Sequence, residues 1–167
     1  MKKVMAGLLA LLLIASLTVP CVAAKVQRSN QKTTVDGIAV SCEVYNIDGS
    51  NYYKLRDLAH LLNGTSAQFS VSWNASTNTV DVYLSEPYED VGGELVIGAD
   101  KSATAKPTTQ TIRIQERPVT GVSIYNIGGS NYIRLRDLNE KLGFTVDYNA
   151  VANIVAIQSE FFGCVDC

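Results

Sequence analysis

Apolar and polar positions divide the chain into a short apolar run at the start and two longer stretches of mixed pattern. Residues 4–17 are uncharged, consist mostly of Leu and Ala, and follow two lysines. This order, followed by Pro20 and small residues up to Ala24, is typical of a secretory signal peptide. The run is too short for a comfortable membrane span, which needs about 20 apolar residues. We therefore predict that residues 1–24 are a signal peptide and that the mature protein is secreted, either extracellular or at the cell surface.

The remaining pattern occurs twice. Residues 45–58 return at residues 125–138 with eleven of fourteen positions identical, and residues 69–75 match the pattern of residues 144–150. Such repetition predicts two copies of one structural unit. The predicted boundaries are a first repeat at 33–84, a linker at 85–108, a second repeat at 109–160 and a cysteine-containing tail at 161–167.

Periodicity predicts the elements inside each repeat. Residues 40–47 have strand composition, and Asp48-Gly49 is a strong hairpin signal because both residues accept a positive φ. Leucines then recur at three and four residues from Leu55 and from Leu135, which predicts a short helix. Alternation over residues 69–73 predicts a second hairpin. The predicted fold class is α+β, with two tandem β-β-α-β-β units that are each a small antiparallel sheet packed on one helix. We also expect one short strand at residues 94–97 of the linker.

Charge and composition narrow the possible functions. The chain of 167 residues has 14 Lys and Arg against 16 Asp and Glu, one His, and 47% hydrophobic residues. A net charge of −2 offers no basic footprint for nucleic acid. Removal of residues 1–24 takes away two lysines and no acids, which leaves −4. We expect a globular protein that does not bind nucleic acid and has no membrane span in the mature chain.

The cysteines leave several arrangements open. Without Cys21, the mature chain keeps Cys42, Cys164 and Cys167, an odd number in a compartment that permits disulfides. We predict a possible disulfide between Cys164 and Cys167. Acylation of Cys21 in a lipoprotein is an alternative, which Pro20 disfavours. A zinc site of the three mature cysteines and His60 has support from residue type alone, and we predict no metal and no cofactor.

No catalytic constellation can be assembled by spacing around the single histidine, so no catalytic residues are predicted. The aromatic side chains are more informative. Tyrosines are numerous for small sheets, and exposed aromatic rings can stack on sugars or fill protein interfaces. Packing in the core is the competing interpretation. Tyr53, Trp73 and Tyr83 are the candidate ligand-binding residues.

Residues 45–58, the pattern Phe69-x-Val71-x-Trp73, residues 91–95 and the second copy through residue 144 resemble the copper amine oxidase N-terminal-like domain, also called the stalk domain. The resemblance covers residues 33–158. It implies a small antiparallel sheet wrapped around a helix, repeated in tandem and displayed outside a Gram-positive bacterium, often beside cell-wall hydrolases or surface-anchoring modules. The family supplies no catalytic residues. The oxidase reaction belongs to a separate, larger domain that needs copper held by three histidines, and this chain has only His60.

These observations predict a non-catalytic, secreted module of the cell envelope that acts as a spacer or as a protein-interaction or adhesion unit. Two alternatives remain open. The first is a module that binds glycan or peptidoglycan, and the second is an accessory subunit of an exported enzyme. An exposed aromatic platform would favour glycan binding, and a large apolar patch would favour a protein partner.

Overall fold

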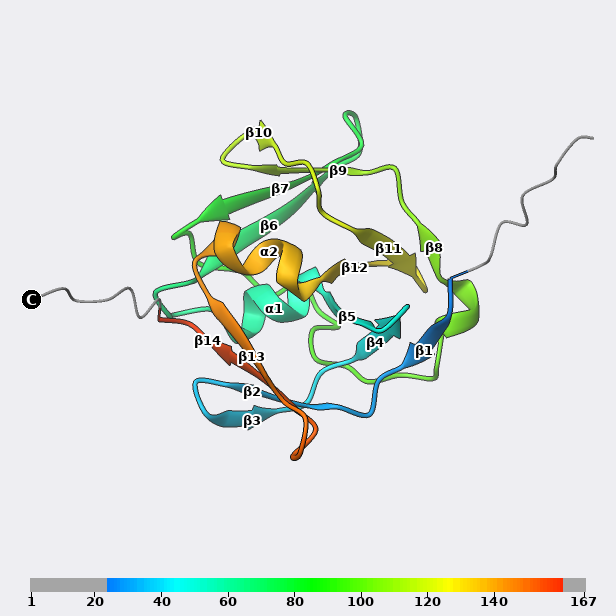
Figure 1. Cartoon of the computed structure of the whole chain (residues 1–167). Coiled ribbons are helices and arrows are strands. Elements are labelled where there is room, and N and C mark those ends of the chain that lie inside the picture. Colours follow the sequence, from blue (N-terminus) through cyan, green and yellow to red (C-terminus); the bar gives the residue numbers. More distant parts are fainter. Residues whose placement is uncertain (1–23, 161–167) are drawn as a thin grey trace, which may run out of the picture.

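The computed structural model describes residues 24–160, within which the chain forms fourteen strands, two short α-helices and one 3-10 turn, η1 (Ser102–Thr104). Helices α1 (Leu55–Leu61) and α2 (Leu135–Leu142) lie in the middle, and three sheets curl around them (Figure 1). Among the described residues, no helix is long and apolar enough to cross a membrane. Residues 1–23 of the predicted signal peptide and the predicted Cys164–Cys167 disulfide lie outside the described part of the chain.

The central sheet has six strands and the two flanking sheets have four each. In spatial order, the central sheet contains β1 (Val26–Arg28), β4 (Val44–Ile47), β5 (Ser50–Lys54), β12 (Ser130–Arg134), β11 (Ile124–Ile127) and β8 (Lys106–Pro107). The sheet that we call the β6 sheet contains β10 (Arg117–Pro118), β9 (Thr111–Ile114), β7 (Thr79–Leu84) and β6 (Phe69–Asn74). The β13 sheet contains β13 (Thr145–Asn149), β14 (Ile154–Gln158), β2 (Lys32–Val35) and β3 (Ile38–Val40).

Every sheet combines strands of both repeats. In the central sheet, β5 of the first repeat pairs antiparallel with β12 of the second. In the β6 sheet, β7 of the first repeat runs parallel to β9 of the second, and in the β13 sheet β14 of the second repeat runs parallel to β2 of the first. The hairpin of β9 and β10 in the second repeat thus pairs with the hairpin of β6 and β7 in the first. In the same way, the hairpin of β2 and β3 in the first repeat pairs with the hairpin of β13 and β14 in the second. The two repeats are related by an approximate two-fold axis.

This arrangement shows that the predicted fold class was wrong. The protein is mostly β, and neither repeat has a sheet of its own packed on its own helix. The physical reason is size, because a unit of about fifty residues buries a smaller fraction of its surface than a larger domain does and is only marginally stable alone. Pairing between the repeats lets both helices share one core. Periodicity along the chain reports which face of a strand is buried and cannot report which strand lies beside it.

The local predictions fared better. Asp48 and Gly49 form the turn between β4 and β5 with φ values of 48° and 82°, and α2 ends at Gly143 in the left-handed conformation. The expected strand at residues 94–97 is absent, because these residues begin with a turn in which Leu95 has a positive φ of 57°. The hairpin of β2 and β3 was missed, although Asp36 and its following glycine carry the same turn signal.

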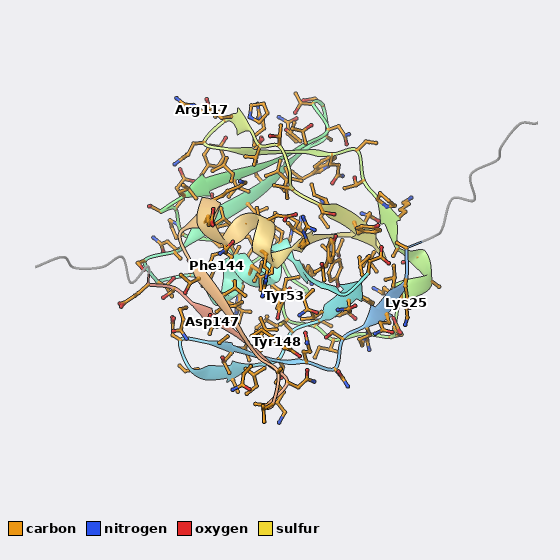
Figure 2. All side chains as sticks on the ribbon, in the orientation of Figure 1. Lys25, Tyr53, Arg117, Phe144, Asp147 and Tyr148 are labelled. Carbon is orange, nitrogen blue, oxygen red and sulfur yellow. The ribbon has the colours of Figure 1, made fainter. Side chains whose placement is uncertain are left out.

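The hydrophobic core has two parts on opposite faces of the central sheet. The larger part lies between the helices and the three sheets and includes Tyr53 and Phe144, which sit near the centre of the molecule in Figure 2. The smaller part is a cluster of tyrosine and isoleucine side chains on the other face. Two edge-to-face pairs link the repeats there, with ring centroids 5.1 Å apart for Tyr45 and Tyr132 and 5.4 Å apart for Tyr52 and Tyr125.

Candidate functional site

The three predicted ligand-binding aromatics lie in three different environments. Tyr53 is completely buried in the main core, where its hydroxyl lies 2.8 Å from Thr33 Oγ1, so its ring is not available to a ligand. Trp73 on β6 is 44% exposed. Tyr83 is half-buried and lies opposite Ser70 in the β6–β7 pair, whereas Trp73 lies opposite Val80. Because side chains alternate along a strand, Trp73 and Tyr83 occupy opposite faces of the β6 sheet. The structure therefore does not bring the three together.

Trp73 instead lines a surface groove, and a second groove of the described residues lies around Tyr148. The Trp73 groove has a volume of about 290 Å³, and the Tyr148 groove has a volume of about 350 Å³. The Trp73 groove is lined by Lys54, Leu55, Arg56, Val71, Ser72, Trp73, Val80, Gln110, Asn126, Gly129, Ser130 and Asn131. The Tyr148 groove is lined by Gln31, Gly49, Ser50, Asn51, Arg134, Leu135, Arg136, Val146, Tyr148 and Val155.

The two grooves are equivalent under the approximate two-fold axis. Each of the ten residues that line the Tyr148 groove has its repeat counterpart in the Trp73 groove. Trp73 corresponds to Tyr148, and Arg56 corresponds to Arg136. Neither groove belongs to one repeat, because the aromatic ring and the arginine come from one copy while the hairpin turn with its serine and asparagine comes from the other. A site built twice from corresponding residues is a feature of the whole two-repeat fold.

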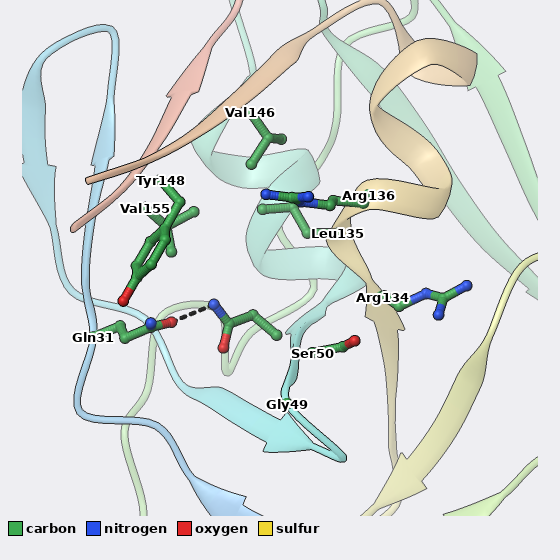
Figure 3. Close-up of a pocket in the computed structure, with 10 residues that line it drawn as sticks. Gln31, Gly49, Ser50, Arg134, Leu135, Arg136, Val146, Tyr148 and Val155 are labelled. Carbon is green, nitrogen blue, oxygen red and sulfur yellow. Dashed lines mark hydrogen bonds between the residues drawn. The ribbon is translucent and has the colours of Figure 1, made fainter. Parts of the chain in front are cut away.

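The sheet edges explain why the aromatic rings reach the surface. Trp73 lies on β6 and Tyr148 lies on β13, which are the outer strands of their sheets. At an edge, no further strand covers a large side chain on the inner face, so its outer part is exposed. Trp73 and Tyr148 are 44% and 47% exposed, which are nearly equal values. Figure 3 shows the Tyr148 ring and the Arg136 side chain bordering the same space. Each groove therefore offers an aromatic ring beside a cation.

The basic side chains of the grooves fall into two kinds. Lys54 and Arg134, just before the helices, bind the aspartates three residues later, with Lys54 Nζ 3.1 Å from Asp57 Oδ1 and Arg134 Nη2 2.7 Å from the Asp137 carboxylate. Arg56 and Arg136 are exposed and form no ion pair with any described residue. The sets of residues that line the two grooves contain no carboxylate.

Asp57 and Asp137, which directly follow Arg56 and Arg136 in the sequence, stabilise the fold. Asp57 is completely buried and accepts a 3.0 Å hydrogen bond from the backbone amide of Leu95, and Asp137 accepts a 2.7 Å bond from the amide of Ser123. Burial raises the pKa of Asp57, while the hydrogen bond from Leu95 and the hydrogen bond and charge of Lys54 oppose the rise. The repeated carboxylate ties each helix to the loop beside it, and the neighbouring arginine is left free at the groove.

The other titratable side chains considered from the sequence lie apart from the grooves. Burial raises the pKa of the Cys42 thiol to about 11, so the thiol stays protonated near neutral pH. His60 Nδ1 lies 2.7 Å from Asp90 Oδ1 on an exposed part of α1. Within residues 24–160, no group of three or more His, Cys, Asp and Glu side chains is arranged to hold a metal ion.

The grooves were not predicted, although the sequence contains some of the residues that line them in its repeated run. Ser50, Asn51 and Arg56 lie in the run that returns as residues 125–138, and we interpreted that run as fold architecture. The polar residues of one copy face the aromatic residue of the other, so no window of the sequence contains a complete groove. The correspondence between Gln31 and Gln110 is seen only in the structure, where each lies just before a strand that pairs in the same register with the last strand of the other repeat.

Comparison with protein-family models, with curated proteins and with solved structures finds no match. The resemblance to the stalk domain stays a prediction from the repeated residues.

Proposed function

We propose that the protein is a non-catalytic carbohydrate-binding module with two corresponding binding grooves, one at each aromatic residue, secreted after removal of residues 1–24 and binding glycan of the cell envelope. The observation that carries this proposal is the duplication of one groove, built between the repeats around an exposed aromatic ring. The resemblance of the repeats to stalk domains supports the placement outside the cell. Spacer, protein-interaction unit and accessory subunit of an exported enzyme are the functions that the experiments below must separate from it.

The chemistry of the groove walls suits a sugar. The flat face of Trp73 or Tyr148 can cover the apolar face of a pyranose ring. The side chains of serine, asparagine and glutamine around it supply both donors and acceptors for ring hydroxyl groups. Few precisely oriented polar groups around an apolar surface are typical of small-molecule sites.

Two grooves on one chain suit a polymer. A ligand with many identical units that is long enough to span both grooves binds with an overall affinity well above that of either groove. A spacer needs no such duplicated pair of polar, partly aromatic grooves. This comparison is why we favour binding over a purely mechanical role.

The test is co-sedimentation of the chain from Lys25 onward with isolated peptidoglycan and with wall polysaccharide. We expect saturable binding that is lost in the double variant Trp73→Ala/Tyr148→Ala. Tyr83→Ala is the matched control, because it removes an aromatic ring from the opposite face of the β6 sheet and leaves both grooves intact. Thermal unfolding of each variant shows that the fold is retained.

Absence of sedimentation at tens of micromolar protein would contradict the proposal and would favour the spacer or a protein partner. Equal binding by the wild-type chain and the double variant would show that the ligand binds outside the grooves. Loss of binding in Tyr83→Ala alone would move the site to the opposite face of the β6 sheet.

A further inference from the structure

The two grooves differ in how their amide side chains are bonded. In the Tyr148 groove, Asn51 Nδ2 donates to Gln31 Oε1, which the dashed line from Gln31 marks in Figure 3. Asn46 Nδ2 donates to Asn51 Oδ1 over 3.3 Å, so three amides form a chain of two hydrogen bonds. The amide nitrogen and oxygen of Asn51 and the amide oxygen of Gln31 are therefore already bonded within the protein.

The corresponding amides of the Trp73 groove are not bonded to one another. Gln110 Oε1 and Asn131 Oδ1 are shielded from solvent, and neither accepts a hydrogen bond from any residue in the described part of the chain. Asn126, the counterpart of Asn46, also lines this groove. A carbonyl oxygen that is buried without a donor is energetically costly. Because each of these oxygens exposes less than 1 Å² of surface, a ligand O–H or N–H group meets it only after the amide side chain turns toward the groove, and the new hydrogen bond then removes that cost.

The same comparison predicts which groove binds more tightly. A ligand in the Tyr148 groove must compete with the bond between Gln31 and Asn51. In the Trp73 groove, Gln110 and Asn131 break no bond to each other when their side chains turn toward a ligand. Tryptophan also presents a larger ring face than tyrosine for stacking. Both differences favour the Trp73 groove.

Charge indicates what else the ligand carries. The exposed guanidinium of Arg56 has no carboxylate partner among residues 24–160, and the residues that line the Trp73 groove include no acidic side chain. Elsewhere the chain has more acidic than basic residues. A planar guanidinium can bind carboxylate or phosphate through two parallel hydrogen bonds.

Resting on the proposed carbohydrate-binding function, we infer that the Trp73 groove is the primary site and that it binds an acidic sugar unit. The sugar ring stacks on Trp73. Its hydroxyl or acetamido groups donate to Gln110 and Asn131, and its carboxylate or phosphate group binds Arg56. The Tyr148 groove is the weaker site for a further unit of the same polymer.

The single tryptophan of the chain makes this testable, because Trp73 fluorescence reports on its own groove alone. The probes are the disaccharide of N-acetylglucosamine and N-acetylmuramic acid, its methyl ester, and a glycerol phosphate oligomer. We expect a saturable fluorescence change with the acidic disaccharide and an affinity lower by about tenfold for the uncharged ester. The phosphate oligomer distinguishes a phosphate ligand from a carboxylate ligand.

Paired variants locate the contacts. We expect Arg56→Gln to weaken binding of the acidic disaccharide by about tenfold and to leave the ester unchanged, while the counterpart Arg136→Gln leaves the fluorescence titration unchanged. Gln110→Ala weakens binding of both disaccharides, and Gln31→Ala does not change the titration. Circular dichroism and thermal unfolding confirm that each variant is folded.

Three results would overturn the inference while the proposed function stands. They are wall binding without any Trp73 fluorescence change, loss of wall binding in Tyr148→Ala but not in Trp73→Ala, and equal affinity for the acid, the ester and the phosphate oligomer. If the wild-type chain binds neither the wall material nor any of the three probes, both the proposed function and the inference are contradicted.

Discussion

Tyr53 and Ile133 occupy the same position in the two repeats and lie directly opposite each other where β5 pairs with β12. The approximate two-fold axis of the protein therefore passes through this pair. Both side chains are completely buried in the main core. At this position the repeats carry different residues, so two identical large side chains do not meet at the axis.

Tyr53 places a hydroxyl group in this core, and we predict that its hydrogen bond with Thr33 is stabilising. Tyr53→Phe keeps the ring and leaves Thr33 Oγ1 without this partner, so we expect a loss of about 1–2 kcal/mol in the free energy of unfolding. Urea unfolding followed by circular dichroism measures it. Tyr83→Phe is the control, because no hydrogen bond of the Tyr83 hydroxyl is seen among the described residues, and it should change stability by less than about 0.5 kcal/mol. Equal effects of the two substitutions would contradict the prediction.

The shared sheets predict that neither repeat folds alone. We expect a fragment of residues 25–98 and a fragment of residues 99–167 to be largely unfolded when separate, because each loses its partners in all three sheets. Mixing the two fragments should restore the structure, since the pairing between β7 and β9 and between β14 and β2 does not need the connecting peptide. Circular dichroism and amide NMR spectra of the fragments, with the intact chain as reference, provide the measurement. Cooperative unfolding of either fragment alone would show that the repeats are independent.

The ion pair between Arg113 and Asp81 joins β9 of one repeat to β7 of the other, with contacts of 2.6 Å and 2.7 Å. The hydrogen bonds and charge of Arg113 hold the pKa of Asp81 below its usual value. The folded state therefore binds a proton at Asp81 less readily than the unfolded state does. The stabilisation is present above the usual pKa of the carboxyl group and is lost as the pH falls through the lowered pKa.

We expect Asp81→Asn to be less stable than the wild-type chain at neutral pH and to approach wild-type stability in acid. Thermal unfolding between neutral pH and about pH 2 tests this, and the difference between variant and wild type isolates Asp81 from other carboxyl groups. Asp57 has the opposite sign, because its raised pKa favours the folded state more as the pH falls. Asp147→Asn on the exposed part of β13 is the control. A difference that stays constant over the whole pH range would contradict the assignment.

Cys42 should react slowly in the folded protein. Burial raises the pKa of its thiol to about 11, whereas an unfolded thiol has a pKa of about 8.5. At pH 8 we expect alkylation of Cys42 to be more than about a hundredfold slower in the native chain than in urea, because only the thiolate reacts. Mass spectrometry of the peptide that contains Cys42 separates it from the other cysteines. Similar rates in the two states would show that the thiol is accessible and ionised.

The local structure was predictable because neighbouring residues determine it. The turn at Asp48-Gly49 needs two residues that accept a positive φ, and the helix that starts at Leu55 needs leucines three and four residues apart. Both signals lie within a few positions of one another. The same signal occurs at Asp36-Gly37, so the hairpin of β2 and β3 was predictable from neighbouring residues as well.

The arrangement of the sheets and the grooves was decided by tertiary structure. A strand pattern shows that one face is buried, and it is equally satisfied by a partner from the same repeat or from the other one. The sequence by itself determined that the chain contains one unit twice, with the same hairpin, helix and hairpin in each. Only the folded chain brings Trp73 of the first repeat beside Asn131 of the second, because two small units become stable by sharing every sheet.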